Sequence, residues 1–115
     1  MEVHKNYFSP YIAALSSNIS NLLPEDLDIS YFSNSGSDAN EGAIKLAYKY
    51  HEGKRDYILN SNISFHGKKI LTSNITDSRE TKYFQFQKLV KSESFEFNNF
   101  ESLSKKVSDL KKSGE

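Results

Sequence analysis

The residues best suited to chemistry lie in the run FSNSGSDANEG, at positions 32–42. Gly36 lets the backbone turn sharply and approach a ligand without a Cβ in the way, and Ser35 and Ser37 add hydroxyl donors. If a helix follows this run, its first backbone amides have no intrahelical acceptor and carry partial positive charge. The run therefore predicts a site for an anion such as phosphate.

Ordinary helix capping is the alternative interpretation of the same residues. Asp38 and Glu41 have the spacing of a capping box, and Ser37 could equally be the cap. The run matches neither GxGxxG nor GxxxxGKS/T, the fingerprints of dinucleotide-binding and P-loop proteins. Taken alone, these residues leave both interpretations open.

The composition limits the classes of partner. The 115 residues are enough for one small domain, and fifteen Lys and Arg balance fifteen Asp and Glu. Because a basic excess is absent, we expect no nucleic-acid partner. No cysteine is present, so no disulfide and no thiolate metal site is expected, and we predict no metal. The apolar runs are too short to cross a bilayer and the start lacks a signal pattern, so we expect a soluble cytoplasmic protein and no membrane partner.

Alternating helical and extended patterns must position these residues. Apolar spacing predicts helices, and short β-branched or aromatic runs between turn residues predict strands. The expected order is a helix over 11–23, a strand over 29–34, a helix from Ala39 to near Gly53, a strand over 56–62, a loop over 63–69, a strand over 94–99 and a helix over 99–112. This order predicts an α/β domain with an at least partly parallel sheet, and the anion site falls where the first strand meets the second helix.

Two blocks of this sequence together resemble the class III aminotransferases. YFSNSGSDANEGAIKLAYKY, at 31–50, is similar to that family's strand, SGxxANE segment and Ala-rich helix, and SFHGKK, at 64–69, is similar to its later FHG. The family's members are pyridoxal-phosphate enzymes of fold type I and include acetylornithine, ornithine and ω-amino acid transaminases. The resemblance implies that residues 1–115 form a single, partial large domain that binds the cofactor, with a mixed, mostly parallel sheet flanked by helices.

The resemblance assigns four residues to pyridoxal 5'-phosphate. Gly36 and Ser37 would give backbone amides to the cofactor phosphate, which agrees with the anion site expected from the residues themselves. Phe65 would stack on the pyridine ring, and His66 would lie at the pocket edge in a supporting role. Without the resemblance, Phe65 reads as core packing and His66 as a solvated turn residue.

The same resemblance assigns Asn40 and Glu41 to holding the loop rather than to substrate contact. Lys68 and Lys69 depart from the family, which commonly has Arg-Thr after FHG, so the following segment is expected to be placed differently. The family's catalytic lysine and its carboxylate in a DExQ-like stretch have no match here. We therefore predict no catalytic residue in this chain.

The function expected from the resemblance is that of a piece of a transaminase. Its parent would transfer an amino group between an amino acid or amine and a keto acid or aldehyde, and would be a homodimer. The alternative is a stand-alone, non-catalytic α/β module that binds a phosphate-bearing ligand or a protein partner. A piece of a larger fold should expose apolar side chains, whereas a stand-alone module should be covered with polar ones.

Overall fold

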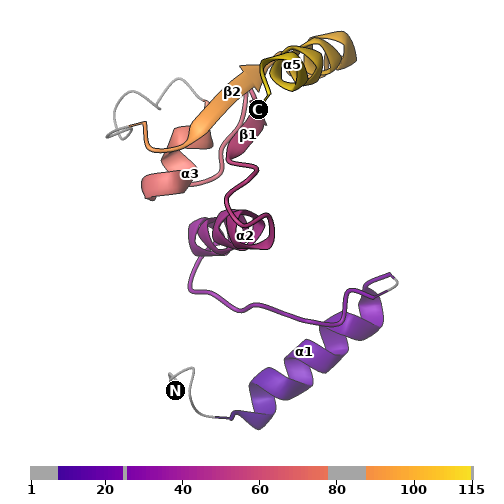
Figure 1. Cartoon of the computed structure of the whole chain (residues 1–115). Helices are drawn as coiled ribbons and strands as arrows, with labels where there is room; N and C mark the ends of the chain where they lie inside the picture. The colour runs from indigo at the N-terminus through magenta and orange to yellow at the C-terminus, as the bar shows by residue number, and fades with distance from the viewer. Residues whose placement is uncertain (1–7, 25, 78–87, 115) are drawn as a thin grey trace. The chain divides into compact units, whose positions relative to one another are not determined.

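The computed structural model describes residues 8–24, 26–77 and 88–114. The chain divides into two compact units, Met1–Phe32 and Ser33–Glu115. Helix α1 (Pro10–Leu22) belongs to the first unit, and the second carries the other elements in Figure 1. These are α2 (Gly36–Tyr50), β1 (Tyr57–Ser61), α3 (Ile70–Ile75), β2 (Lys91–Phe95) and α5 (Phe100–Ser113).

Helix α1 confirms the helix predicted over 11–23. Pro10 stands at its first position, where a missing N–H is harmless, and the first helical bond runs from the Ala13 amide to the Ser9 carbonyl at 3.0 Å. None of its side chains is buried. The helix ends at Leu22, just before Pro24.

The strand predicted over 29–34 is wrong, because these residues form neither strand nor helix. Within the part of the chain that the structure describes, no strand pairs with them. Their β-branched and aromatic residues favour a strand only where a neighbouring strand provides backbone partners. Ile29 is accordingly 93% exposed.

Helix α2 begins three residues earlier than its apolar spacing predicts. Ser35 is the last residue with extended backbone, and its Oγ accepts a hydrogen bond from the Asp38 amide at 3.2 Å. Ser35 is therefore the N-cap, and the prediction that Ser37 or Asp38 caps the helix was wrong. At the other end, the Gly53 amide bonds to the Tyr48 carbonyl at 3.1 Å, which confirms the predicted closure near Gly53.

Strands β1 and β2 pair in parallel, from Tyr57 opposite Lys91 to Ser61 opposite Phe95. β1 confirms the strand predicted over 56–62, but β2 lies earlier than the strand predicted over 94–99. The chain turns after Phe95, where Asn98 takes a positive φ of 55°. The parallel pair between helices makes the domain α/β, as the element order predicted.

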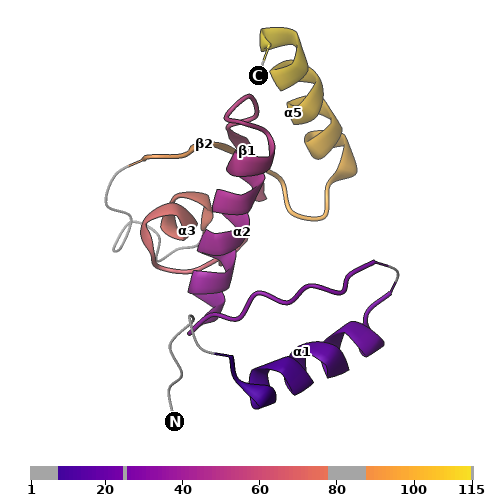
Figure 2. The ribbon, with the colours of Figure 1, turned by 60° about the horizontal axis from the view of Figure 1, so that its bottom comes forward.

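Helix α3 was not predicted, and it completes the small core of the second unit. Ile44, Ile75 and Val90 are buried there, with Tyr48, Ile58 and Leu71 packed against them. α3 contacts α2 and both strands, as Figures 1 and 2 show. It thereby ties the start of α2 to the sheet through the segment that joins the strands.

Helix α5 confirms the helix predicted over 99–112. The Asn99 side chain caps it by accepting from the Ser102 amide at 2.9 Å, and Gly114 ends it with a left-handed φ of 83°. Along the described stretches, no helix has the length and apolar character needed to span a membrane.

Candidate functional site

The predicted anion-binding residues lie at the N-terminus of α2. Gly36 and Ser37 are its first two helical residues, so neither amide has an acceptor within the helix. A Cβ added at Gly36 would meet nothing within 4 Å, so the space beside this glycine is open. The geometry fits an anion that approaches the first turn of α2 closely.

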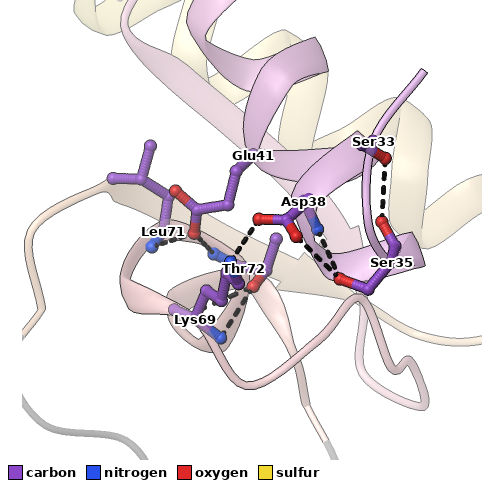
Figure 3. Close-up of polar contacts among 7 residues, drawn as sticks. All are labelled: Ser33, Ser35, Asp38, Glu41, Lys69, Leu71 and Thr72. Atoms are coloured by element: carbon purple, nitrogen blue, oxygen red, sulfur yellow. Dashed lines mark hydrogen bonds and ion pairs between the residues drawn. The ribbon is translucent and has the colours of Figure 1, made fainter. Parts of the chain in front are cut away.

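The loop that follows β1 reaches the same turn of α2. The Asn40 side-chain amide donates to the His66 carbonyl at 2.9 Å, and Lys69 Nζ forms an ion pair with Asp38 Oδ1. Figure 3 shows the Asp38 carboxylate between Ser35 and Lys69. The two sequence blocks, at 31–50 and 64–69, therefore converge in the folded unit.

Gly67 brings the backbone of the loop close to the first turn of α2. It is buried and has a φ of +133°, a conformation that residues with a side chain rarely adopt. A Cβ there would lie 2.1 Å from Ser37 Oγ and 2.8 Å from Ser37 Cβ. Only glycine lets the loop lie against the first turn of α2 at this distance.

Thr76, which sequence reasoning missed, fixes the backbone of the loop. Its hydroxyl accepts from the His66 amide at 3.0 Å and lies 3.1 Å from the Gly67 carbonyl, and the residue is only 2% exposed. A threonine in TSNIT carries no sequence signal for such a role, because it acts ten residues away from the atoms that it holds. Its role becomes visible only in the fold.

Asn40 and Glu41 hold the loop and its continuation, as the resemblance implied. Glu41 Oε1 accepts from the backbone amides of Leu71 at 2.7 Å and Thr72 at 3.0 Å, in the first turn of α3. In Figure 3 the Glu41 side chain extends from α2 to these two amides. The first two turns of α2 thus bind the loop at one point and α3 at another.

The two remaining predicted residues lie on the loop itself. The Phe65 side chain is 62% exposed, so it is not the core residue that composition alone would favour. His66 is half-buried, and its backbone carries the contacts to Asn40 and Thr76. The exposed ring of Phe65 is available to a ligand, and its role, like those of Gly36, Ser37 and His66, remains a prediction.

A separate polar cavity of about 440 Å³ lies beside the strands. Several of its polar groups bond to one another: Lys106 Nζ lies 2.5 Å from Glu93 Oε2, and Ser92 Oγ donates to the Asn74 carbonyl at 3.3 Å. Lys106 holds the pKa of the Glu93 carboxyl below its usual value, and Glu93 raises the pKa of Lys106 in return. In residues 8–24, 26–77 and 88–114, no cluster of three or more His, Cys, Asp or Glu could hold a metal ion.

Comparison with known proteins decides the family. The model of the family described as "Aminotransferase class-III" matches residues 3–113. The chain belongs to the class-III aminotransferase family. The resemblance carried by the blocks at 31–50 and 64–69 is thereby confirmed, together with the α/β class.

Several relatives of this class-III chain are named acetylornithine aminotransferase. The one from Prochlorococcus marinus subsp. pastoris is 40% identical over 87 residues, which cover 70% of this chain and 20% of that protein. The one from Synechocystis sp. is 41% identical over 87 residues, again 70% of this chain and 20% of the relative. A third, from Methanothermobacter thermautotrophicus, is 49% identical over 53 residues, 46% of this chain and 13% of the relative. The chain spans about a fifth, or less, of the length of these relatives.

The surface of the chain agrees with this family rather than with a stand-alone module. Large apolar side chains are exposed in both units, among them Leu22 at 85% in the first and Phe100 at 80% in the second. A self-contained binding module was expected to cover such side chains with polar ones. The alternative of a small independent module is therefore not favoured.

Proposed function

We propose that this chain supplies the phosphate-binding and ring-stacking parts of a pyridoxal-phosphate-dependent transaminase, as part of its cofactor-binding large domain. The Gly36 and Ser37 amides hold the cofactor phosphate, Phe65 stacks on the pyridine ring and His66 closes the pocket edge. When bound, the cofactor supplies the electron sink for chemistry at the substrate α-carbon. The chain's own residues bind and orient it.

The observation that carries this proposal is the convergence of the FHG loop with the first turn of α2. The bond from Asn40 to the His66 carbonyl and the approach of Gly67 to Ser37 bring Phe65's loop beside the two open amides. A cofactor with a phosphate at one end and an aromatic ring at the other needs both kinds of group within one ligand length. The open space beside Gly36 admits the phosphate.

Electrostatics at this turn favours a bound phosphate once Asp38 is neutralised. The Asp38 carboxylate would repel a phosphate, but Lys69 pairs with it. The amides and dipole of α2 then favour an anion by about 0.3–1 kcal/mol in an exposed setting and by more when the site is covered. Lys69 belongs to the Lys-Lys pair that stands where the family commonly has Arg-Thr, and here its side chain neutralises Asp38.

The substrates follow from the family and its named relatives. The amino group passes between an amino acid or amine and a keto acid or aldehyde, and acetylornithine is the donor to test first because these relatives share that name. The exposed apolar side chains support contact with further protein surface, so we propose a homodimeric parent enzyme. A cytoplasmic location fits the absence of cysteine.

The proposal is tested by cofactor retention in a full-length class-III aminotransferase that carries this segment. Phe65→Ala is expected to weaken pyridoxal-phosphate binding by about 2- to 10-fold, since aromatic stacking contributes about 0.5–1.5 kcal/mol beyond buried area. Gly36→Val should weaken it more, because its branched side chain fills the space beside the amides. Equilibrium dialysis with absorbance detection of the cofactor measures both effects.

A matched control separates the site from general packing. Phe97→Ala removes a ring of similar exposure, 59%, outside the loop. This variant should leave cofactor binding close to that of the unsubstituted enzyme. If Gly36→Val and Phe65→Ala also bind the cofactor like the parent, Gly36 is a turn residue, Phe65 is a surface ring, and the proposal is wrong.

A further inference from the structure

The first turn of α3 is held by a side chain from another helix. Glu41 lies in the second turn of α2, and its single oxygen Oε1 accepts from the Leu71 and Thr72 amides at 2.7 and 3.0 Å. Both amides belong to the first turn of α3, where a helix lacks acceptors of its own. Glu41 is therefore a helix cap that is supplied from a residue 30 positions away in the sequence.

The FHG loop is attached directly to this capped helix. The Lys69 amide donates to Thr72 Oγ1 at 3.1 Å, so the end of the loop depends on the first turn of α3. At the far end of α3, the Thr76 hydroxyl accepts from the His66 amide at 3.0 Å and lies close to the Gly67 carbonyl. A displacement of α3 would therefore move the backbone of the loop.

We propose that Glu41 is a positioning residue: by capping α3 from α2, it sets the place of the 65–69 loop relative to the Gly36 and Ser37 amides. The part of this inference that concerns the cofactor rests on the proposed function, whereas the part that concerns α3 stands on the contacts alone. Glu41 touches no ligand in this scheme. Its effect on binding passes through α3 and the loop.

Amide hydrogen exchange by NMR on the 115-residue chain tests the cap directly. Glu41→Met keeps the length of the side chain but has no oxygen, so exchange at Leu71 and Thr72 should accelerate by roughly tenfold or more, the loss expected for two hydrogen bonds to a charged group. Glu41→Gln keeps one carbonyl oxygen, and in the unsubstituted chain one oxygen makes both bonds. Exchange at Leu71 and Thr72 should therefore stay within about threefold of that in the unsubstituted chain. Val90, buried in the core, reports on global opening.

A control carboxylate distinguishes the cap from general charge effects. Glu101 is exposed in the first turn of α5, and Glu101→Met should leave exchange at Leu71 and Thr72 unchanged. Parent-like exchange at both amides in Glu41→Met overturns the proposal. If Glu41→Met does not fold, Glu41→Asp decides: its shorter side chain withdraws the carboxylate from the two amides, so parent-like exchange at Leu71 and Thr72 overturns the proposal as well.

Titration with pyridoxal phosphate then tests the link to the ligand. In a full-length class-III aminotransferase that carries this segment, Glu41→Met should raise the pyridoxal phosphate concentration for half-maximal binding severalfold, whereas Glu41→Gln should leave it close to the unsubstituted value. If Gly36→Val and Phe65→Ala leave that concentration unchanged, the proposed function is refuted, while the exchange data still decide the cap. If Glu41→Met accelerates amide exchange at Leu71 and Thr72 but binds pyridoxal phosphate as tightly as the unsubstituted protein, Glu41 has no effect on the ligand site.

Discussion

Replacing Gly67 by alanine tests whether the loop and α2 really meet as closely as described. The new Cβ would lie 2.1 Å from Ser37 Oγ, 2.8 Å from Ser37 Cβ and 2.9 Å from Thr72 Oγ1. The two hydroxyls can rotate away, but Ser37 Cβ is fixed to the helix backbone, so the loop itself must move. The φ of +133° adds strain for any residue with a side chain.

These two effects set the size of the expected loss. Forcing a side chain into an unfavourable backbone region costs about 1–3 kcal/mol, and overpacking costs typically about 1–3 kcal/mol. A movement of the loop relieves part of both costs, so we expect Gly67→Ala to lower the free energy of unfolding by about 2–4 kcal/mol, less than their full sum. At a urea m value of about 1.5 kcal/mol/M, the unfolding midpoint measured by far-ultraviolet circular dichroism should fall by about 1.5–2.5 M.

A double-mutant cycle isolates the contact with Ser37. Ser37→Gly removes both atoms of the closest approach, so in that background Gly67→Ala should cost about 1–2 kcal/mol less, leaving mainly the backbone strain. Gly36→Ala is the opposite control, since its Cβ meets nothing, and it should be neutral or stabilising by up to about 1 kcal/mol. A loss below about 0.5 kcal/mol for Gly67→Ala, or an equal loss in both backgrounds, would refute the close approach.

Two further predictions concern lysine chemistry and pH. Incubation of the chain with pyridoxal phosphate, borohydride reduction and peptide mapping should show scattered lysine labelling, because no lysine here matches the family's catalytic position; one lysine labelled at one equivalent would contradict this. The pKa of Glu93 is lowered in the folded chain, so its pairing with Lys106 stabilises the fold above the ordinary glutamate pKa. This stabilisation is lost as the pH falls through the lowered pKa of Glu93. The pKa of Lys106 is raised, so at the alkaline end the pairing is lost as the pH rises through that raised pKa. As the pH is lowered from about 7 to 2, the urea midpoint should therefore fall less steeply in Glu93→Gln than in the unsubstituted chain. If the midpoint falls equally steeply in both, the pair does not contribute to stability.

The elements that the sequence predicted well are those whose signals are local. Helices α1, α2 and α5 have apolar residues at helical spacing. Residues that mark where a helix stops or starts lie directly beside them: Pro24 after α1, Gly53 after α2 and Asn99 before α5. The cap of α2 was misplaced because several serines and an aspartate compete for it, and only the extended backbone at Ser35 decides among them.

The elements that failed depend on contacts with distant residues. Helix α3 has no apolar period of its own, and its first turn depends on Glu41 of α2. Strand β2 is set by its pairing with β1, which selects the polar stretch Lys91–Phe95 over the aromatic alternation that continues to Phe97. Phe97 lies beyond the strand and is 59% exposed. In such cases backbone pairing with a neighbouring strand, rather than the strand propensity of the residues, decides which of them form the strand.

The sequence predicted the individual residues of the candidate site better than the contacts that bring them together. The residues around Gly36 indicated an anion site from chemistry alone, whereas the partnership with the FHG loop came from the resemblance to the family. The contacts that join the two, from Asn40 to the His66 carbonyl and from Gly67 to Ser37, span 26 and 30 residues of sequence, and Thr76 fixes the loop from ten residues away. No local pattern could have indicated them.

The parallel pairing of β1 with β2 also orders events during synthesis. Tyr57 pairs with Lys91 and Ser61 with Phe95, so β1 leaves the ribosome 34 residues ahead of the strand that it pairs with. At about 5–20 residues per second, that interval lasts on the order of a few seconds. Throughout it, β1 offers an unpaired edge to other nascent chains. The separation of the two strands along the chain therefore sets a period of vulnerability to aggregation, and slower translation should lengthen it.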